Sequence, residues 1–519
     1  MWVMTLKIAD HPQPAPTLST LPAWIGGRQH PSQGSRQGDI HNPATGEVIR
    51  RVPFATAEDV HEAVTAAERA FPGWRGTTPL DRARILTRFR ELLQQNRERI
   101  ARVISEEHGK TVADAVGSVQ RGIEVVEFAV GVPHLLKGEH AEDVGTGVDC
   151  HSMLQPLGVC AGITPFNFPA MVPLWMFPLA IACGNTFVLK PSEKVPSASM
   201  EMAALFKEAG LPDGVFNVVH GDKDVVDALL KHPTVRAISF VGSTPVAQHI
   251  YATAAAQGKR VQALGGAKNH AVVLPDANLA FTADALIGAG FGSAGQRCMS
   301  ISAVVAVGEI GDALVDALAQ RASQLKVGPG LEPRVMMGPV ITAQHRDRVK
   351  GYIDGGVAQG ATLVLDGRGV QVPGHENGFF VGPTIFDQVS PDMTIYRDEI
   401  FGPVLIVLRA KSLDEAIAIV NRNPYGNGTA IFTESGTAAR RFQREIEVGM
   451  VGINVPIPVP MAFFSFGGWK SSLFGDLHMH GMEGVSFYTR TKVITHRWTS
   501  AGTTPSPSLA MPVMGERKE

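Results

Sequence analysis

Short runs rich in β-branched residues alternate along the chain with longer stretches in which apolar residues recur at helical spacing. The strand-like runs span residues 187–189, 238–241, 271–274, 303–307 and 404–408, and helical stretches such as 200–209 and 313–324 lie between them. This repetition of strand, helix and strand predicts an α/β fold of parallel sheets joined by right-handed crossovers.

One helix start is marked clearly near the N-terminal end. Thr78 is expected to cap a helix whose first turn contains Pro79. Apolar residues then recur at helical spacing and predict a single apolar face, made by Leu86, Phe89, Leu93, Ile100, Val103 and Ile104.

Length and composition set the broad class. A chain of 519 residues is too long for one ordinary core, so at least two domains are expected. The formal net charge of -2 gives no basic field for nucleic acid or an anionic membrane surface. The apolar stretch 170–183 is too short to span a bilayer and contains two prolines. Residues 1–20 are expected to be a flexible leader without a signal-peptide pattern, and residues 500–519 a flexible tail.

The four cysteines are Cys150, Cys160, Cys183 and Cys298. Their spacing contains no CxxC pair and no metal-binding pattern, so no metal site is expected. A disulfide framework is unusual in a chain this long, and a reducing compartment is therefore the expectation. Together with the absent signal pattern this predicts a cytoplasmic protein.

Cys298 is the candidate nucleophile. It ends the segment Gly295–Cys298, which follows a Gly/Ala-rich stretch over 287–294. A thiolate attacks best where small neighbours let a substrate approach the sulfur. The alternative is a buried, inert cysteine, which is the commoner case for a lone cysteine.

Asn167 is the candidate oxyanion donor. It lies between aromatic residues and prolines in Thr164–Pro169, where its amide can point at an oxygen on a reacting carbon. The alternative is an asparagine that binds its own backbone in a loop.

Three further segments suit a dinucleotide. Lys190 and Glu193 follow a strand and can hold ribose hydroxyls at the carboxyl edge of a parallel sheet. Gly242 and Ser243 stand between a strand and a helix, a place that binds pyrophosphate. Glu399 can bind a second ribose, with Phe401 beside the nicotinamide ring. No GxGxxG fingerprint is present. The alternative for the segment with Lys190 and Glu193 is a solvated turn, and the alternative for the segment with Glu399 is the entry of a loop into a strand.

Taken in this order, the segments TPFNFP, FVLKPSE, FVGST, GQRC, EIFGPV and NPYGNGTAIFT resemble the aldehyde dehydrogenase superfamily from about residue 22 to residue 495. The resemblance implies a Rossmann-type cofactor domain over 21–139 and 159–264. It also implies an α/β catalytic domain over 265–479 and a β-hairpin oligomerisation arm over 140–158 and 480–499. A homotetramer or homodimer is expected with this architecture.

The resemblance also assigns roles. Cys298 is the nucleophile, and Asn167 binds the oxyanion together with the backbone N–H of Cys298. Lys190 and Glu193 hold the adenosine ribose, and Glu399 holds the nicotinamide ribose. The remaining expected contacts are Thr164, Phe166, Gly242, Ser243 and Phe401 to the cofactor and Phe168 to the substrate. Because the Glu193 carboxylate would repel the extra phosphate of NADP, NAD is the expected cofactor.

The sequence departs from hydrolytic members of the family at one position. Those members carry a glutamate, in the motif E-L-G-G-K, that activates water to release the acyl group. Here a gapless register puts Leu264 at that position, and a one-residue slip puts Ala263 there. Neither side chain takes a proton, so the thioester on Cys298 should await another acceptor. Coenzyme A carries its own thiol and needs less help than water.

In lacking this glutamate, the sequence resembles the CoA-acylating methylmalonate-semialdehyde dehydrogenase branch of the family. The segments 121–127, 261–278, 295–300 and 452–472 are also similar to it, although Leu264 replaces a polar residue usual there. The implied reaction oxidises malonate or methylmalonate semialdehyde, releases CO₂ and yields acetyl- or propanoyl-CoA. Arg121 and Arg297 are candidates to bind the substrate carboxylate, the alternative being a solvated helix residue and a salt bridge.

Two other functions remain open. One is a non-acylating NAD-dependent aldehyde dehydrogenase that uses another base for hydrolysis. The other is a non-catalytic binding or structural protein that kept the fold. Because Cys298, Asn167, Lys190 and Glu399 are all present, the sequence favours an enzyme.

Overall fold

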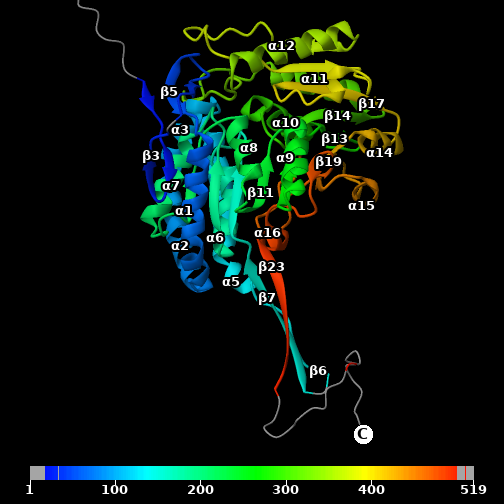
Figure 1. Ribbon diagram of the computed structural model, residues 1–519. Coiled ribbons are helices and arrows are strands. Elements are labelled where there is room, and N and C mark those ends of the chain that lie inside the picture. The colour runs from blue at the N-terminus through cyan, green and yellow to red at the C-terminus, as the bar shows by residue number, and fades with distance from the viewer. Residues whose placement is uncertain (1–17, 33, 146, 499–508, 510–519) are drawn as a thin grey trace, which may run out of the picture.

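The computed structural model describes residues 18–498, apart from residues 33 and 146, together with residue 509. The predicted leader and tail therefore lie almost entirely outside the described residues. Two large sheets with helices packed on their faces form the body, and a three-stranded arm extends away from it (Figure 1).

The first sheet has eight strands, and five central strands run parallel. In spatial order the strands are β22 (Leu473–Phe474), β12 (Arg260–Leu264), β11 (Val235–Val241), β8 (Val159–Ile163), β9 (Thr186–Lys190), β10 (Phe216–Val218), β2 (Ala23–Ile25) and β3 (Arg28–His30). The strands predicted over 187–189 and 238–241 are confirmed as parts of β9 and β11.

Helices cover both faces of this sheet and build two apolar clusters. One face carries α1 (Ala57–Gly76), α8 (Lys223–Lys231) and α9 (Thr244–Ala256). The other carries α6 (Met171–Ala182) and α7 (Ser197–Glu208), with α2 (Pro79–Gln95), α3 (Arg97–His108), α4 (Val112–Val130) and the short α5 (Val132–Leu135) in the same cluster. The sheet is thus buried on both sides, as expected of parallel strands.

The second sheet has seven strands, and all but β15 run parallel. Its order is β15 (Thr362–Leu365), β16 (Thr384–Asp387), β17 (Val404–Ala410), β14 (Ile301–Val307), β13 (Asn269–Val273), β19 (Gly428–Phe432) and β20 (Met450–Ile453). The three strands predicted in this half are confirmed as β13, β14 and β17. One face packs on α10 (Leu279–Phe291) and α11 (Ile310–Ala322), and the other on α12 (Ala343–Ala358), α14 (Leu413–Arg422) and α15 (Gly436–Glu445).

The helix predicted to begin at Thr78 does begin there, because the Thr78 hydroxyl accepts the Asp81 N–H at 3.2 Å. The single apolar face predicted from Leu86 to Ile104 is wrong in one respect. Asn96 ends α2 and its side chain donates to the Leu92 carbonyl at 2.8 Å, so the chain continues as a separate helix, α3. Both helices still bury their apolar residues in one cluster.

The arm consists of β23 (Thr489–Arg497), β7 (Val148–Pro156) and β6 (His140–Gly145), with β23 as an edge strand (Figure 1). These strands fall within the two segments expected to form it. By contrast, β22 lies within the segment expected to be catalytic but pairs with β12 of the first sheet. The exact domain limits stay a prediction.

Two smaller sheets complete the strands: β1 (Ser19–Thr20), β5 (Val48–Pro53) and β4 (Gln37–His41), and the pair β18 (Tyr425–Gly426) and β21 (Trp469–Lys470). The remaining short helices are α13 (Thr394–Arg397) and α16 (Gly481–Phe487). Within the described part of the chain, no helix is long and apolar enough to cross a membrane.

Candidate active site

The carboxyl ends of the parallel strands in the first sheet bring distant motifs together. Ile163 of β8 pairs with Lys190 of β9 on one side and with Phe240 of β11 on the other. Thr164 follows this row directly, and its N–H donates to the Lys190 carbonyl at 3.1 Å. Ligands at such an edge bind outside the strand ends.

Lys190 and Glu193 lie together at this edge. The Lys190 side chain is almost fully buried, and its Nζ lies 3.2 Å from Glu193 Oε2. Burial would raise the pKa of Glu193, but Lys190 and Lys194 together lower it to about 2. The edge therefore carries a carboxylate that stays ionised at physiological pH.

Next to this edge, two glycines pack tightly against neighbouring side chains at the wall of a cleft. A Cβ on Gly242 would lie 2.4 Å from the Phe240 ring, and one on Gly266 would lie 2.5 Å from Glu399 Oε2. Ser243 caps α9 without a side-chain hydrogen bond to its first turn. Ser243, Thr244 and Pro245 line the cleft, so the N-terminus of α9 opens onto it, a place that suits a phosphate.

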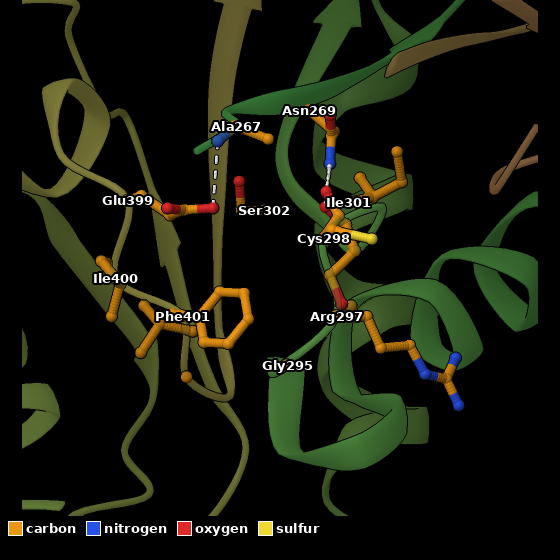
Figure 2. Close-up of a pocket in the computed structure, with 14 residues that line it drawn as sticks. Ala267, Asn269, Gly295, Arg297, Cys298, Ile301, Ser302, Glu399, Ile400 and Phe401 are labelled. Carbon is orange, nitrogen blue, oxygen red and sulfur yellow. Dashed lines mark hydrogen bonds between the residues drawn. The ribbon is translucent and has the colours of Figure 1, made fainter. Parts of the chain in front are cut away.

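The cleft contains about 1100 Å³ of empty space, part of it open to solvent. Segments from both sheets line it, including Asn167, Gly242, Ser243, Cys298, Arg348, Glu399 and Phe401. A smaller pocket of about 350 Å³ adjoins it, with Cys298 on one side and Glu399 and Phe401 on the other (Figure 2).

Cys298 is presented by a strained loop. Ser293, Ala294 and Gly295 have φ angles of 54°, 52° and 70°, and such angles cost non-glycine residues about 1–3 kcal/mol each. The buried Gln296 side chain accepts the Ile341 N–H at 3.0 Å and anchors the loop. A Cβ on Gly295 would lie 2.1 Å from the Gly402 carbonyl, so only glycine lets the Cys298 and Phe401 loops pack together.

Two amides that the sequence reasoning missed hold the nucleophile. The Cys298 carbonyl accepts Asn269 Nδ2 at 2.9 Å (Figure 2) and Asn427 Nδ2 at 3.1 Å. Both asparagines stand in segments already singled out for the resemblance, 261–278 and NPYGNGTAIFT. Their signal was present, but nothing in the chain says which carbonyl they bind.

The Cys298 thiol is not activated by its protein surroundings alone. Burial and the Glu399 carboxylate raise its pKa to about 12, against the backbone N–H groups of Cys298 and Met299 and the Lys110 ammonium. The thiol is therefore protonated at neutral pH until a bound cation or a base changes this balance.

Glu399 lies across the pocket from Cys298. Its Oε1 accepts the Ala267 N–H at 3.0 Å, and burial raises its pKa to about 7 against that N–H and the Lys268 ammonium. Lys268 donates to the carbonyls of Ile395 and Asp398 and so holds the segment before Glu399. Phe401 has a φ of 58°, and its ring meets the Phe166 ring edge-on at 5.8 Å.

Leu264 ends β12 with 4% of its surface exposed. It belongs to the apolar cluster that contains Phe168 and Met299 and against which Cys298 packs. Ala263, the other candidate for the missing glutamate position, is fully buried in the cluster on the opposite face. In either register the end of β12 brings no ionisable group to the site.

The two arginines predicted to bind substrate both have partners in the structure. Arg297 Nη2 lies 2.8 Å from Asp114 Oδ1, and its guanidinium runs away from Glu399 and Phe401 (Figure 2). Arg121 Nη1 lies 2.5 Å from Glu124 Oε2, and its Nη2 donates to the Pro460 carbonyl at 2.6 Å. The salt bridge considered for Arg297 is thus present, and Arg121 ties α4 to the segment 459–461 rather than facing solvent alone.

Known proteins match this chain over most of its length. The sequence model of the aldehyde dehydrogenase family matches residues 30–494. A malonate-semialdehyde dehydrogenase of Pseudomonas aeruginosa is 58% identical over 95% of this chain and 100% of its own. A mitochondrial acylating methylmalonate-semialdehyde dehydrogenase of Arabidopsis thaliana is 54% identical over 98% of this chain and 83% of its own.

Solved structures confirm the predicted fold class. A methylmalonate-semialdehyde dehydrogenase of Oceanimonas doudoroffii superposes with a TM-score of 0.92 at 56% identity, covering 93% of this chain and 99% of that one. A Sinorhizobium meliloti protein complexed with NAD has a TM-score of 0.93 at 52% identity, covering 94% and 100%.

Proposed function

Because the chain belongs to the aldehyde dehydrogenase family, we propose that it oxidises malonate or methylmalonate semialdehyde with NAD and transfers the acyl group to coenzyme A. The observation that carries the CoA-acylating part is Leu264, an apolar residue at the end of β12 where a hydrolytic glutamate is expected. The relatives named above as semialdehyde dehydrogenases support the substrate class.

NAD fits the cleft described above. Its adenosine ribose would bind Lys190 and Glu193, its pyrophosphate Gly242 and Ser243, and its nicotinamide ribose Glu399. Thr164, Phe166 and Phe401 would complete its contacts. The placement is supported by the lining of the cleft, which includes Gly242, Ser243 and Glu399. When bound, NAD supplies the acceptor for the hydride and a positive charge near the thiol.

The residues can then perform the following chemistry. The Cys298 thiol gives its proton to water, and the thiolate attacks the aldehyde carbon. Asn167 with the Cys298 N–H stabilises the oxyanion that forms. NAD held in the cleft would accept a hydride from this adduct, which would leave a thioester on Cys298. The acyl group loses CO₂, and the carbon left behind takes a proton from water. The thiolate of coenzyme A attacks the thioester, the Cys298 sulfur departs, and it regains a proton.

The substrate carboxylate needs a cation near Cys298. We assign Arg121 and Arg297 to this role, with Phe168 as an apolar wall. Each arginine would exchange or share its present partner, Glu124 or Asp114, with the substrate. A methyl group in an apolar pocket changes binding by only about 1–3 kcal/mol, so either semialdehyde can be the better substrate.

One observation favours a second function, a hydrolytic aldehyde dehydrogenase. Glu399 lies across the pocket from Cys298, and its pKa of about 7 suits a general base. In that case Glu399 would activate the water that Leu264 cannot.

Self-association and place of action complete the proposal. The edge strand β23 exposes 64% of Val493, and an exposed strand edge invites pairing with another chain. We therefore propose a homodimer or homotetramer assembled through the arm. Free thiols at all four cysteines support a reducing compartment, which we take to be the cytoplasm.

Turnover with and without coenzyme A tests the proposal. The purified protein is given malonate or methylmalonate semialdehyde with NAD, and products are identified by mass. We expect acetyl- or propanoyl-CoA only when coenzyme A is present, and no NADH from a Cys298→Ala protein. Free acid formed at the same rate without coenzyme A supports Glu399 hydrolysis and refutes the acylating function.

A further inference from the structure

The short link between α3 and α4 carries Lys110, whose side chain contacts the backbone of Asn167. Gly109 ends α3 with a φ of 90°, Thr111 caps α4, and Lys110 stands between them. A Cβ on Gly330 would lie 2.2 Å from the Lys110 carbonyl, and one on Gly338 would lie 1.9 Å from the Gly109 carbonyl. The backbone around Lys110 is therefore held tightly by a neighbouring loop.

The Lys110 side chain is fully buried and reaches the segment Thr164–Pro169, which contains Asn167. Its Nζ donates to the Asn167 carbonyl at 2.8 Å and lies 4.3 Å from the centre of the Phe168 ring. The same Nζ lies 3.6 Å from Asp114 Oδ2. Lys110 thus holds the backbone of the residue whose amide we assign to the oxyanion.

Asp114 extends the contact to the nucleophile loop. Its Oδ1 lies 2.8 Å from Arg297 Nη2, and Arg297 directly precedes Cys298 in the chain. Lys110, Asp114 and Arg297 therefore form one ion cluster that links the Asn167 loop to the Cys298 loop. Asp114 stays ionised, because Lys110 and Arg297 lower its pKa to about 2 although burial would raise it.

We propose that Lys110 is a positioning residue that sets the Asn167 loop against the Cys298 loop through Asp114 and Arg297. Burying an ion pair rarely stabilises a protein more than apolar residues of the same volume would. A role in stability alone would therefore be served as well by an apolar side chain. An ammonium at this place also acts on the sulfur, since Lys110 opposes the burial that raises the pKa of the Cys298 thiol.

This inference rests on the roles proposed for Cys298 and Asn167, but one readout does not require turnover. Alkylation of Cys298 by iodoacetamide, followed by mass spectrometry of the peptide that contains it, measures the thiolate directly. The variants are Lys110→Met, which removes the charge, Lys110→Arg, which restores it, and Asp114→Asn, which removes the opposing charge. Lys259→Met is the matched control, because Lys259 is also buried and also donates to backbone carbonyls, those of His232 and Val235.

We expect Lys110→Met to slow Cys298 alkylation at pH 8 by at least about threefold, because the thiolate loses a nearby cation. Asp114→Asn should speed it, because the ammonium is then less compensated. In turnover, Lys110→Met should lower kcat at least about tenfold, with the KM for NAD changed less than about twofold. Lys110→Arg should recover part of the alkylation rate and part of kcat. Lys259→Met should change neither the alkylation rate nor kcat.

The decisive result is that Lys110→Met slows the alkylation of Cys298 whereas Asp114→Asn speeds it. Structural damage would change the alkylation rate of both variants in the same direction. The proposal is overturned if both variants change the alkylation rate in the same direction. It is also overturned if a folded Lys110→Met protein is alkylated at a rate within about twofold of the wild type. If Lys110→Met does not fold, the comparison of Asp114→Asn with wild type decides, and an unchanged or slower alkylation overturns it. Failure of the proposed function is separate, because it appears as NADH formation that survives Cys298→Ala.

Discussion

Restoring an acid at the end of β12 tests why the acyl group should wait for coenzyme A. Leu264→Glu places a carboxyl group in the apolar cluster against which Cys298 packs. Burial should raise its pKa as it does for Glu399, which reaches about 7. About half of the carboxyl groups would then be ionised at pH 7, which lowers the effect of a general base by about twofold.

The magnitude follows from these values. A positioned general base accelerates a reaction by about 10²–10⁴-fold, so the release of free acid without coenzyme A should rise at least about 50-fold. Burying the new carboxylate destabilises the folded protein by about 1.4 kcal/mol per unit of pKa shift, or about 3–4 kcal/mol for a shift from 4.5 to 7. This destabilisation is fully present above pH 7 and disappears as pH falls toward 4.5, because the folded-state pKa is the raised one.

The assay compares Leu264→Glu with Leu264→Gln, which has the same shape and no base. Both proteins should give a burst of NADH from one turnover, which shows that the acyl-enzyme forms. Only Leu264→Glu should then release free acid without coenzyme A. If Leu264→Glu folds, gives the burst and still releases acid no faster than Leu264→Gln, the lack of an acid on β12 is not what retains the thioester.

Three further predictions concern other parts of the protein. Arg121→Gln should raise the KM for malonate semialdehyde about 10–100-fold and leave the KM for propanal unchanged, because a charged hydrogen bond contributes about 1.5–3 kcal/mol. Equal changes in KM for both aldehydes would contradict a carboxylate-binding role. Glu399→Gln should raise the KM for NAD and raise the melting temperature at pH 8. The wild-type pKa of about 7 makes the Glu399 carboxylate destabilising above pH 7 and harmless near pH 4.5. A melting temperature that falls equally at pH 8 and at pH 4.5 would refute this. Val493→Lys should reduce the assembled mass in light scattering, because a charge on the edge strand opposes pairing, and an unchanged mass would argue against assembly through the arm.

Much of the local structure is readable from short stretches of sequence. The start of α2 depends on Thr78 and Pro79, and the parallel strands β9, β11, β13, β14 and β17 follow from runs of β-branched residues. These features involve neighbours in the chain, so their signals lie within a few residues. The end of α2 at Asn96 was missed, because apolar spacing continues across it and only the Asn96 side chain, bonded to the Leu92 carbonyl, marks the break.

In the candidate site, too, some residues are identified by local motifs, whereas other contacts depend on the folded chain. Its reactive groups, Cys298, Asn167, Lys190 and Glu399, are identifiable from motifs, because each reactive side chain comes with a short local pattern. The pair Asn269 and Asn427 was not identified as the support of the Cys298 carbonyl, although both lie in those motifs. An amide can bind any nearby carbonyl, and the one it binds depends on how two strands of the second sheet come together.

The sequence alone determined which chemical groups the protein possesses and which short segments form strands and helices. Only the tertiary structure decided which charge meets which. Arg297 pairs with Asp114, 183 residues away, and Lys110 reaches Asn167, 57 residues away. The physical reason is that an ion pair or hydrogen bond depends on distances of a few ångströms, and those distances are set when the whole chain has packed, not by spacing along it.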